Sequence, residues 1–383
     1  MYKQIKVTAI FVSFLMLAAL GTATFGQGRR PDRNLHAGAV YVMTNQVENA
    51  VAVFRRSPTG MLTSAGEFPT GGAGDPVPQG TDPATDPLAS QGALILGNNQ
   101  FLFAVNAGSN QISVLRVGRN ELTMIDLVDS GGIRPISLAL HEDLLYVLNE
   151  GGTPNITGFT VNDDGTLTPL PDSTQPLIGG TSADPAEVSF NADGTLLVVT
   201  EKAGNRINTY MIDENGLPSA PIDNPSNGMT PFGFAFNDSG TLVVSEAFGG
   251  APNQSAVSSY SAPESGILSV VSGSIPNFQT ASCWVVTTSN GKSAFVSNTG
   301  SGTISSYGIG EDGTLTLANA VAGDTGPGSA PIDMAVNNSS RFLYVIVAGT
   351  QSVASFRVER DGSLTLIDTD GGLPLGAQGI AAK

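Results

Sequence analysis

Carboxylic acids recur at matching places in a pattern of short apolar segments. A glutamate follows three successive apolar runs, as Glu150, Glu201 and Glu246, while Glu187 and Asp333 each lie two residues after a proline. If these positions converge in the fold, the crowded carboxylates raise one another's pKa, which suits proton transfer. Several oxygens at one channel mouth also suit Ca²⁺ or Mg²⁺.

Three cations lie close to these acids in the sequence, namely Arg134, Lys202 and Arg206. One interpretation is an acid–base site or a cation site. The alternative is that the carboxylates are solvated on loops, and that Arg206 pairs with Glu201 only to hold a loop. The residues alone leave both interpretations open.

Histidine and cysteine chemistry is less favoured. His36 precedes the first strand, and His141 lies in a hairpin that we expect to face away from the channel mouth. Cys283 is the only cysteine and has no histidine partner in the sequence pattern, so we interpret it as a small core residue. The sequence contains no P-loop, GxSxG, HExxH or metal-spaced Cys/His motif.

The elements that must position these residues form a repeat. Each copy has four short strand signals separated by turns such as NADG and EDGT, and the copies end 44 to 61 residues apart. Seven copies close on Phe54, Leu115, Phe159, Tyr210, Tyr260, Tyr307 and Phe356. This pattern predicts an all-β, seven-bladed β-propeller. A β-helix would use shorter parallel repeats, and a sandwich would not keep one motif through seven copies.

In a propeller, residues at the start of the first strand of each blade line one end of the channel. This expected inner column comprises Gly92, Ser137, Glu187, Gly233, Cys283, Asp333 and Gly379. The first copy lacks its first strand, and residues 375–383 resemble the first strand at 88–96. We therefore expect the C-terminal strand to pair with the N-terminal blade and close the ring.

An insertion at 69–90, rich in Pro, Gly and Asp, separates the first two copies. It is interpreted either as a lid over one face or as a passive surface loop.

Composition limits the partners. The formal net charge is −16, which disfavours nucleic acid, anionic membrane surfaces and phosphorylated substrates because their phosphates would be repelled. A cation, a neutral sugar or a basic partner is compatible with this charge. We expect a monomer that binds a small lactone or a glycan.

The N-terminus predicts export to the periplasm or the extracellular space. Lys3 and Lys6 precede an apolar run at 7–20 and small residues, so 1–26 is interpreted as a signal peptide and 27–35 as a linker before the propeller at 36–383. The alternative is a membrane anchor, but the apolar run is short for a span of about 20 residues. We therefore expect no membrane span after cleavage.

The repeated LYV-N-G-ISVF and DG-LT segments resemble the seven-bladed lactonase propellers, which include 6-phosphogluconolactonase and carboxymuconate cyclase relatives, and the broader YVTN-type repeat. The resemblance covers about 36–383. The family's DLGxDR segment is matched by EKAGNR at 201–206. Arg206 corresponds to the arginine of the family segment, and Glu201 takes the place of its first aspartate. The family's NEL segment is matched by SEA, which contains Glu246.

The resemblance implies lactone hydrolysis, with one departure. Family histidines in PH and PRH patterns are replaced here by Glu187 and Gly233. A lactonase of this kind would use Glu187, Glu201 or Glu246 as its base and Arg206 to polarise the carbonyl. The other candidates are assigned to substrate binding, namely Glu150, Arg134, Lys202 and Asp333.

Two functions follow from the sequence. The first is an exported lactonase-like hydrolase acting on a sugar lactone or a related lactone, for which the acidic mouth disfavours a phosphosugar. The second is a non-catalytic envelope propeller that binds a glycan, a cation or a protein.

Overall fold

The computed structural model describes residues 37–77, 85–119 and 121–383. Residues 36–383 form one compact unit. The expected signal peptide, the linker and His36 lie outside the described residues, as do residues 78–84 of the insertion.

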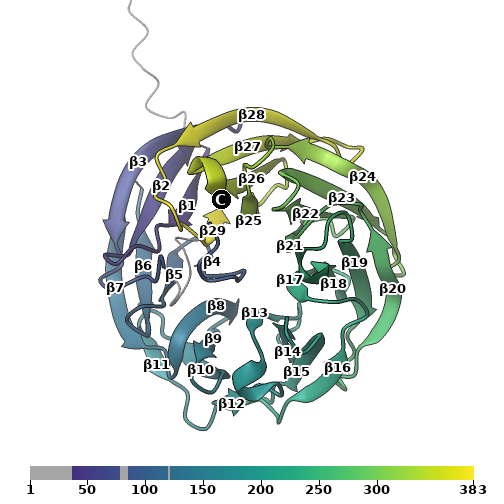
Figure 1. Cartoon of the computed structure of the whole chain (residues 1–383). Coiled ribbons are helices and arrows are strands. Elements are labelled where there is room, and N and C mark those ends of the chain that lie inside the picture. Colours follow the sequence, from purple (N-terminus) through teal and green to yellow (C-terminus); the bar gives the residue numbers. More distant parts are fainter. Residues whose placement is uncertain (1–36, 78–84, 120) are drawn as a thin grey trace, which may run out of the picture. The chain divides into compact units, whose positions relative to one another are not determined.

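Seven antiparallel sheets, numbered here as blades 1 to 7, surround a central channel (Figure 1). Blade 1 contains β29 (Ile380–Ala382), β1 (Gly38–Met43), β2 (Ala50–Arg56) and β3 (Leu62–Pro69); blade 2 contains β4 (Leu94–Gly97), β5 (Phe101–Asn106), β6 (Gln111–Val117) and β7 (Leu122–Asp129). Blade 3 contains β8 (Ile133–His141), β9 (Leu144–Gly151), β10 (Asn155–Val161), β11 (Leu167–Pro169) and β12 (Gln175–Pro176). The predicted seven-bladed propeller is confirmed.

The remaining blades follow in chain order around the ring. Blade 4 contains β13 (Pro185–Phe190), β14 (Leu196–Glu201), β15 (Arg206–Met211) and β16 (Ile222–Pro225); blade 5 contains β17 (Pro231–Phe236), β18 (Thr241–Glu246), β19 (Ala256–Ser261) and β20 (Ser269–Pro276). Blade 6 contains β21 (Ser282–Thr287), β22 (Ser293–Asn298), β23 (Thr303–Ile309) and β24 (Leu315–Asp324); blade 7 contains β25 (Pro331–Val336), β26 (Phe342–Val347), β27 (Ser352–Val358) and β28 (Leu364–Gly371). The described residues also form the short 3₁₀ turns η1 (Gly180–Ser182), η2 (Phe248–Gly250) and η3 (Ala348–Thr350).

The C-terminal strand closes the ring as expected. β29 pairs antiparallel with β1, with Val40 opposite Ala382 and Val42 opposite Ile380. This pairing supplies the innermost strand of blade 1 and covers an edge of β1 that would otherwise be open.

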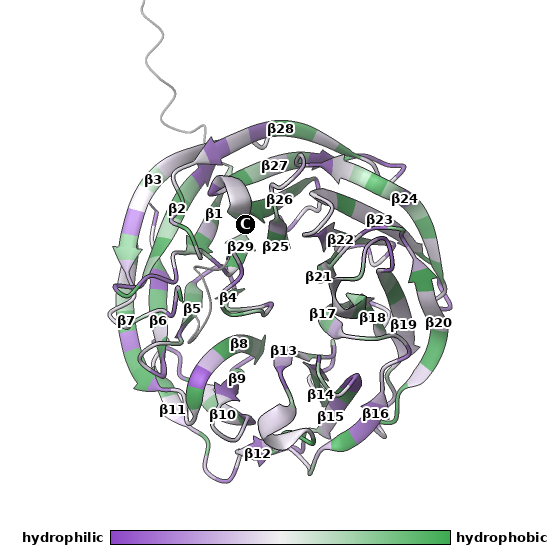
Figure 2. Ribbon diagram, in the orientation of Figure 1, coloured by the Kyte–Doolittle hydropathy of each residue, from purple (hydrophilic) through white to green (hydrophobic). Residues whose placement is uncertain are grey.

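Burial follows the position of each strand within its blade. The second strands are buried on both faces, as in β14, which is buried along its whole length. The outermost strands mix exposed and buried residues, as in β7, and they alternate in hydropathy in Figure 2. The hydrophobic core therefore lies between adjacent blades rather than in the channel.

Turn chemistry explains why the strands reverse where they do. The four main strands of each blade are termed a, b, c and d in chain order, with blade 1 taking β29 as its strand a. In three of the turns between strands c and d, an aspartate accepts hydrogen bonds from the backbone N–H and the hydroxyl of the Thr or Ser two residues later: Asp164 with Thr166, Asp312 with Thr314, and Asp361 with Ser363. The glycine between each pair has a φ of 79° to 93°, which favours glycine.

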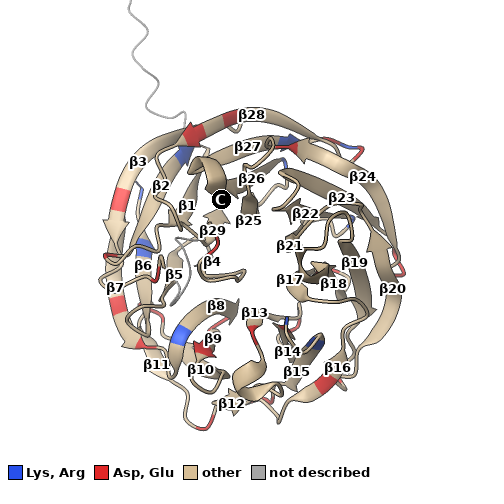
Figure 3. Cartoon of the chain, in the orientation of Figure 1, with Lys and Arg blue, Asp and Glu red and all other residues tan. Residues whose placement is uncertain are grey.

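Charged residues lie mainly on the loops and the outer strands (Figure 3). Within the part of the chain that the structure describes, no helix has the length and apolarity needed to cross a membrane.

Candidate functional site

The first strand of each blade lines the channel, as expected for the inner column. A cavity of about 550 Å³ there is lined by Gln91, Glu187 and Asp333, among others. A neighbouring cavity of about 450 Å³ shares Gln91, Glu187 and Ser189 with it. Two carboxyl groups from blades 4 and 7 therefore line the same cavity.

Asp333 is the less satisfied of these two acids. Its side chain is 3% exposed, its Oδ1 accepts a hydrogen bond of 2.9 Å from the Met334 backbone, and its Oδ2 is buried without a partner among the described residues. Burial raises the pKa of Asp333 to about 8 and the nearby Asp86 adds to the rise, against the lowering effect of the backbone N–H groups of Met334, Gly379 and Ile380. Asp333 is therefore mostly protonated at neutral pH.

Glu187 faces the same cavity. Its Oε2 accepts a hydrogen bond of 2.6 Å from the backbone N–H of Phe234 in the next blade. Burial raises the pKa of Glu187 well above its usual range, and the nearby Asp333 raises it further, while the Phe234 N–H lowers it. A pair of this kind can hold a proton at neutral pH and exchange it with a bound molecule.

The b–c end of the channel is filled by the chain itself. Residues 86–91, here termed the channel plug, follow the undescribed part of the insertion, and Leu88 and Ser90 are buried. The Gln91 side chain forms a two-bond pair with Val285, its Oε1 accepting at 2.9 Å and its Nε2 donating at 2.8 Å. The Ser90 carbonyl accepts a hydrogen bond of 2.9 Å from the Trp284 indole.

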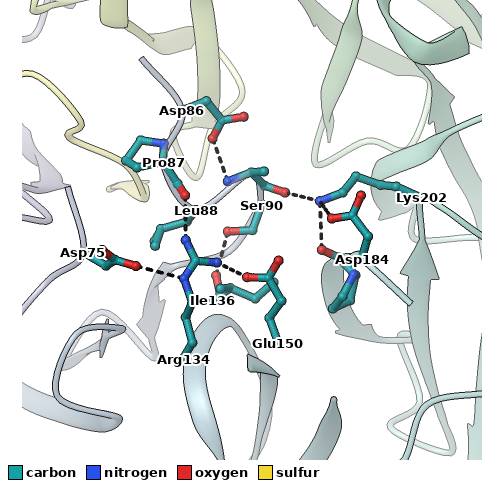
Figure 4. Close-up of polar contacts among 12 residues, drawn as sticks. Asp75, Asp86, Pro87, Leu88, Ser90, Arg134, Ile136, Glu150, Asp184 and Lys202 are labelled. Carbon is teal, nitrogen blue, oxygen red and sulfur yellow. Dashed lines mark hydrogen bonds and ion pairs between the residues drawn. The ribbon is translucent and has the colours of Figure 1, made fainter. Parts of the chain in front are cut away.

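Two cations that the sequence assigned to substrate binding contact the plug (Figure 4). Arg134 donates to the Pro87 carbonyl at 2.7 Å and pairs with Asp75 and Glu150. Lys202 is 8% exposed and donates to the carbonyls of Ala89 at 2.8 Å and Pro185 at 3.0 Å.

Asp86 links the plug to the C-terminus. Its carboxylate accepts hydrogen bonds from the Ala89 backbone at 3.0 Å and from the Gln378 side chain, whose oxygen in turn accepts from the Leu88 backbone at 2.6 Å. Burial raises the pKa of Asp86 to about 7, and Lys202 limits the rise. Within its described part, the insertion is therefore more than a passive surface loop.

Glu201 and Glu246 hold loops between blades. Glu201 is buried and accepts the Gly179 N–H at 3.0 Å as well as a bond from Asn208. Glu246 accepts the Gly228 N–H at 2.8 Å. Burial raises the pKa of both carboxyl groups, and these donors oppose the rise.

The equivalent position performs this task in five of the seven blades. In each case the side chain at the end of the second strand bonds the d–a loop: Asn106 with Thr70, Asn149 with Ser130, Glu201 with Gly179, Glu246 with Gly228, and Asn298 with Asn277. Register confirms the equivalence, because Pro135, Pro185 and Pro231 oppose Asn149, Glu201 and Glu246. The expected alignment of Glu150 with Glu201 and Glu246 is therefore wrong by one residue, because the residue that lies opposite Pro135 in blade 3 is Asn149.

Arg206 is 28% exposed and lies at the side of this network. Its Nη1 donates to Asp223 at 3.1 Å, and its Nε is 3.8 Å from Glu201. These contacts agree with the interpretation that Arg206 pairs with Glu201 to hold a loop.

The expected acidic cluster is divided among these networks. Among the described residues, no group of three or more His, Cys, Asp or Glu side chains could hold a metal ion. Cys283 is buried in the channel wall, and burial raises the pKa of its thiol. His141, at the a–b hairpin of blade 3, packs beside Phe190 with the ring centres 5.9 Å apart.

Sequence reasoning missed Gln91, Gln378 and Asp86. A signal for the glutamines was present, because SQG at 90–92 and AQG at 377–379 occupy equivalent places before β4 and β29. Both side chains bond across the channel mouth. Asp86 had no such signal, since its burial depends on contacts with Gln378, 292 residues away.

The solved structures similar to this one include proteins named as lactonases. A putative 6-phosphogluconolactonase from Bacteroides fragilis shares 16% identity with a TM-score of 0.64, over 92% of this chain and 99% of that chain. A periplasmic gluconolactonase from Pseudomonas aeruginosa shares 15% identity with a TM-score of 0.66, over 89% of this chain and 98% of that chain. At such identities the likeness establishes the fold.

Sequence comparison with protein families is more decisive. No curated protein matches the chain in sequence. The family model described as Lactonase, 7-bladed beta-propeller, matches residues 36–176 and 97–247, which together span more than half of the chain. The chain therefore belongs to the seven-bladed β-propeller lactonase family.

Proposed function

We propose that this propeller hydrolyses a neutral lactone in the channel cavity, with Glu187 and Asp333 as its acid–base pair. The observation that supports the proposal most strongly is the unpartnered Oδ2 of buried Asp333 in a cavity of about 550 Å³ that Glu187 also lines. A buried polar atom without a partner in a cavity of ligand size indicates a site for a polar molecule.

The chemistry needs one ionised and one protonated carboxyl group. The ionised group takes a proton from water as the water oxygen attacks the lactone carbonyl carbon. The protonated group donates its proton to the ring oxygen as the carbon–oxygen bond breaks, which yields a hydroxy acid. Burial and mutual repulsion raise both pKa values, so at least one member of the pair keeps its proton at a higher pH than an ordinary carboxyl group does, and the two groups titrate in separate steps.

The site also favours an uncharged substrate. A phosphate or carboxylate would enter beside two acids with no cation from the described residues lining the cavity. The hydroxy acid product ionises and is then repelled, which favours its release.

Ring opening releases a proton, so turnover is measured as acidification in a weakly buffered solution with a panel of neutral and phosphorylated sugar lactones. We expect hydrolysis of neutral lactones, and a loss of at least about 100-fold in Glu187→Gln and Asp333→Asn. Glu264→Gln, at an exposed turn of blade 5, is the matched control. Full activity in both channel variants would refute the assignment.

A second function is a binding propeller without turnover. It is favoured by the loop-holding contacts of Glu201 and Glu246 and by the occupied b–c end of the channel. Stabilisation of the fold by a lactone or glycan that is not consumed would support this function.

Export completes the proposal, on the evidence of the basic start and the apolar run at 7–20. Mass spectrometry of the chain from the periplasm or medium of an expressing bacterium should find a new N-terminus near residue 24 or 27. An intact N-terminus in a membrane fraction would support an anchor instead.

A further inference from the structure

We infer that a ligand reaches the channel cavity through the a–b hairpin face, and that the plug closes the b–c face to it. The inference rests on the proposed function for the kind of ligand but not for the route. It assigns the entrance to Asn98, Asn99, Glu142 and Asn338, which lie on the hairpins of blades 2, 3 and 7.

The plug is bonded to elements on opposite sides of the channel. Besides Val285 of blade 6, Gln91 reaches the Phe234 carbonyl of blade 5 at 3.3 Å. The Gln91 backbone N–H donates to Ala186 of blade 4 at 3.0 Å, and the Ser90 hydroxyl donates to Ile136 of blade 3 at 2.8 Å. A segment fixed on four blades leaves little room for a ligand to pass beside it.

The exposure of the residues that line the cavity increases from the plug end to the hairpin end. At the plug end it is formed by Gln91, Glu187 and Asp333, all less than 9% exposed. At the hairpin end it is formed by Asn99 and Asn338, which are exposed. The cavity is therefore continuous from the buried acids to solvent on the hairpin side.

The entrance has a chemistry of its own. Asn338 donates to the Asn99 side chain at 3.3 Å across the rim. Asn98 adds a third amide, and Glu142 is the only acid among the residues that line this end. Amides both donate and accept hydrogen bonds, which matches the hydroxyl and carbonyl groups of a neutral sugar lactone.

Thiol labelling tests the route without turnover. In a Cys283→Ser background, Ser189→Cys places the only thiol on the cavity wall, and its reaction with a small neutral methanethiosulfonate is timed. We expect Asn99→Trp and Asn338→Trp each to slow labelling at least tenfold. Met229→Trp, 55% exposed on a d–a loop of the other face, should change the rate less than twofold.

A second cysteine position tests the route in case the Ser189→Cys variant misfolds. Ile95→Cys lies on the same cavity wall and should show the same dependence on the rim, with folding checked by a cooperative melt. Labelling that ignores both rim tryptophans, or that slows with Met229→Trp, would overturn the route.

Failure of the route and failure of the proposed function give different results. A protein that labels through the rim but opens no lactone retains the route and loses the function. A protein that opens lactones at an unchanged kcat/KM in Asn99→Trp and Asn338→Trp retains the function and loses the route.

Discussion

Removal of residues 378–383 should abolish cooperative folding, because these residues close the ring. Four backbone hydrogen bonds outside the β1–β29 ladder join this segment to β1, between Ala39 and Lys383 in both directions and between Met43 and residues 378 and 379. At about 1 kcal/mol each they contribute roughly 4 kcal/mol. Burial of Ile380, which is 6% exposed, contributes about 2 kcal/mol more.

The combined loss of about 6 kcal/mol is comparable with the whole stability of a typical domain, about 5–15 kcal/mol. Two additional contacts disappear with it, because Gln378 bonds both Leu88 and Asp86 of the plug. The truncation therefore opens the ring and removes one anchor of the plug, while the bonds to Arg134, Lys202 and Val285 remain. The point variant Ile380→Ala isolates the packing contribution and should cost roughly 2–4 kcal/mol.

Urea unfolding followed by the fluorescence of Trp284, the single tryptophan, is a suitable assay because its indole bonds the plug at Ser90. Circular dichroism in the same samples reports the sheets. Leu375→Ala, at a side chain 37% exposed, is the control and should change stability by less than about 0.5 kcal/mol. A truncated chain with the parental midpoint and a single transition would refute closure by β29 as a source of stability.

Three further outcomes follow from the site. Because the pKa of Asp333 is about 8 in the folded protein and its ordinary value is 3.8, its contribution to stability is present at low pH and is lost as the pH rises from about 4 to about 8; Asp333→Asn should flatten the fall of Tm over this range and stabilise the protein at pH 8 by a few kcal/mol at most. Arg206→Ala should cost no more than about 1 kcal/mol, since its ion pairs are partly exposed, and should leave lactone hydrolysis within threefold; a large loss of kcat would instead support the family-derived role of Arg206. Gly233→Ala should cost about 1–3 kcal/mol, because the added Cβ would lie 2.7 Å from the Cys283 carbonyl and would also meet Gln91; Gly308→Ala, which meets nothing closer than 3.9 Å, is the matched control in thermal melts.

The fold was predictable because its determinants are local and repeated. The turn aspartates, such as Asp312, bond residues two positions away, and the buried residues Phe159 and Tyr210 recur on the third strand of successive blades. Each copy therefore reports the same arrangement. The similarity between 375–383 and 88–96 extended this logic to the ring closure.

The site was predictable only in its inner column. Glu187 and Asp333 follow prolines that fix the start of the first strand, so their position facing the channel could be derived from register. The role of Glu201 could not, because the partner that determines it is the backbone N–H of Gly179 on a loop of variable length. A glutamate that accepts a hydrogen bond from a loop and a glutamate that faces a substrate occur in the same sequence pattern, so the pattern does not distinguish them.

The contacts of the plug have a consequence for the order of folding. Ser90 and Gln91 meet partners 194 residues later in the chain, and Leu88 meets Gln378 after 290 residues. Such distant pairings form late, since the entropy of closing the long intervening chain must be lost first. The bonds of the plug with Trp284, Val285 and Gln378 therefore form only after blade 6 and β29 are in place, later than its bonds with Arg134 and Lys202.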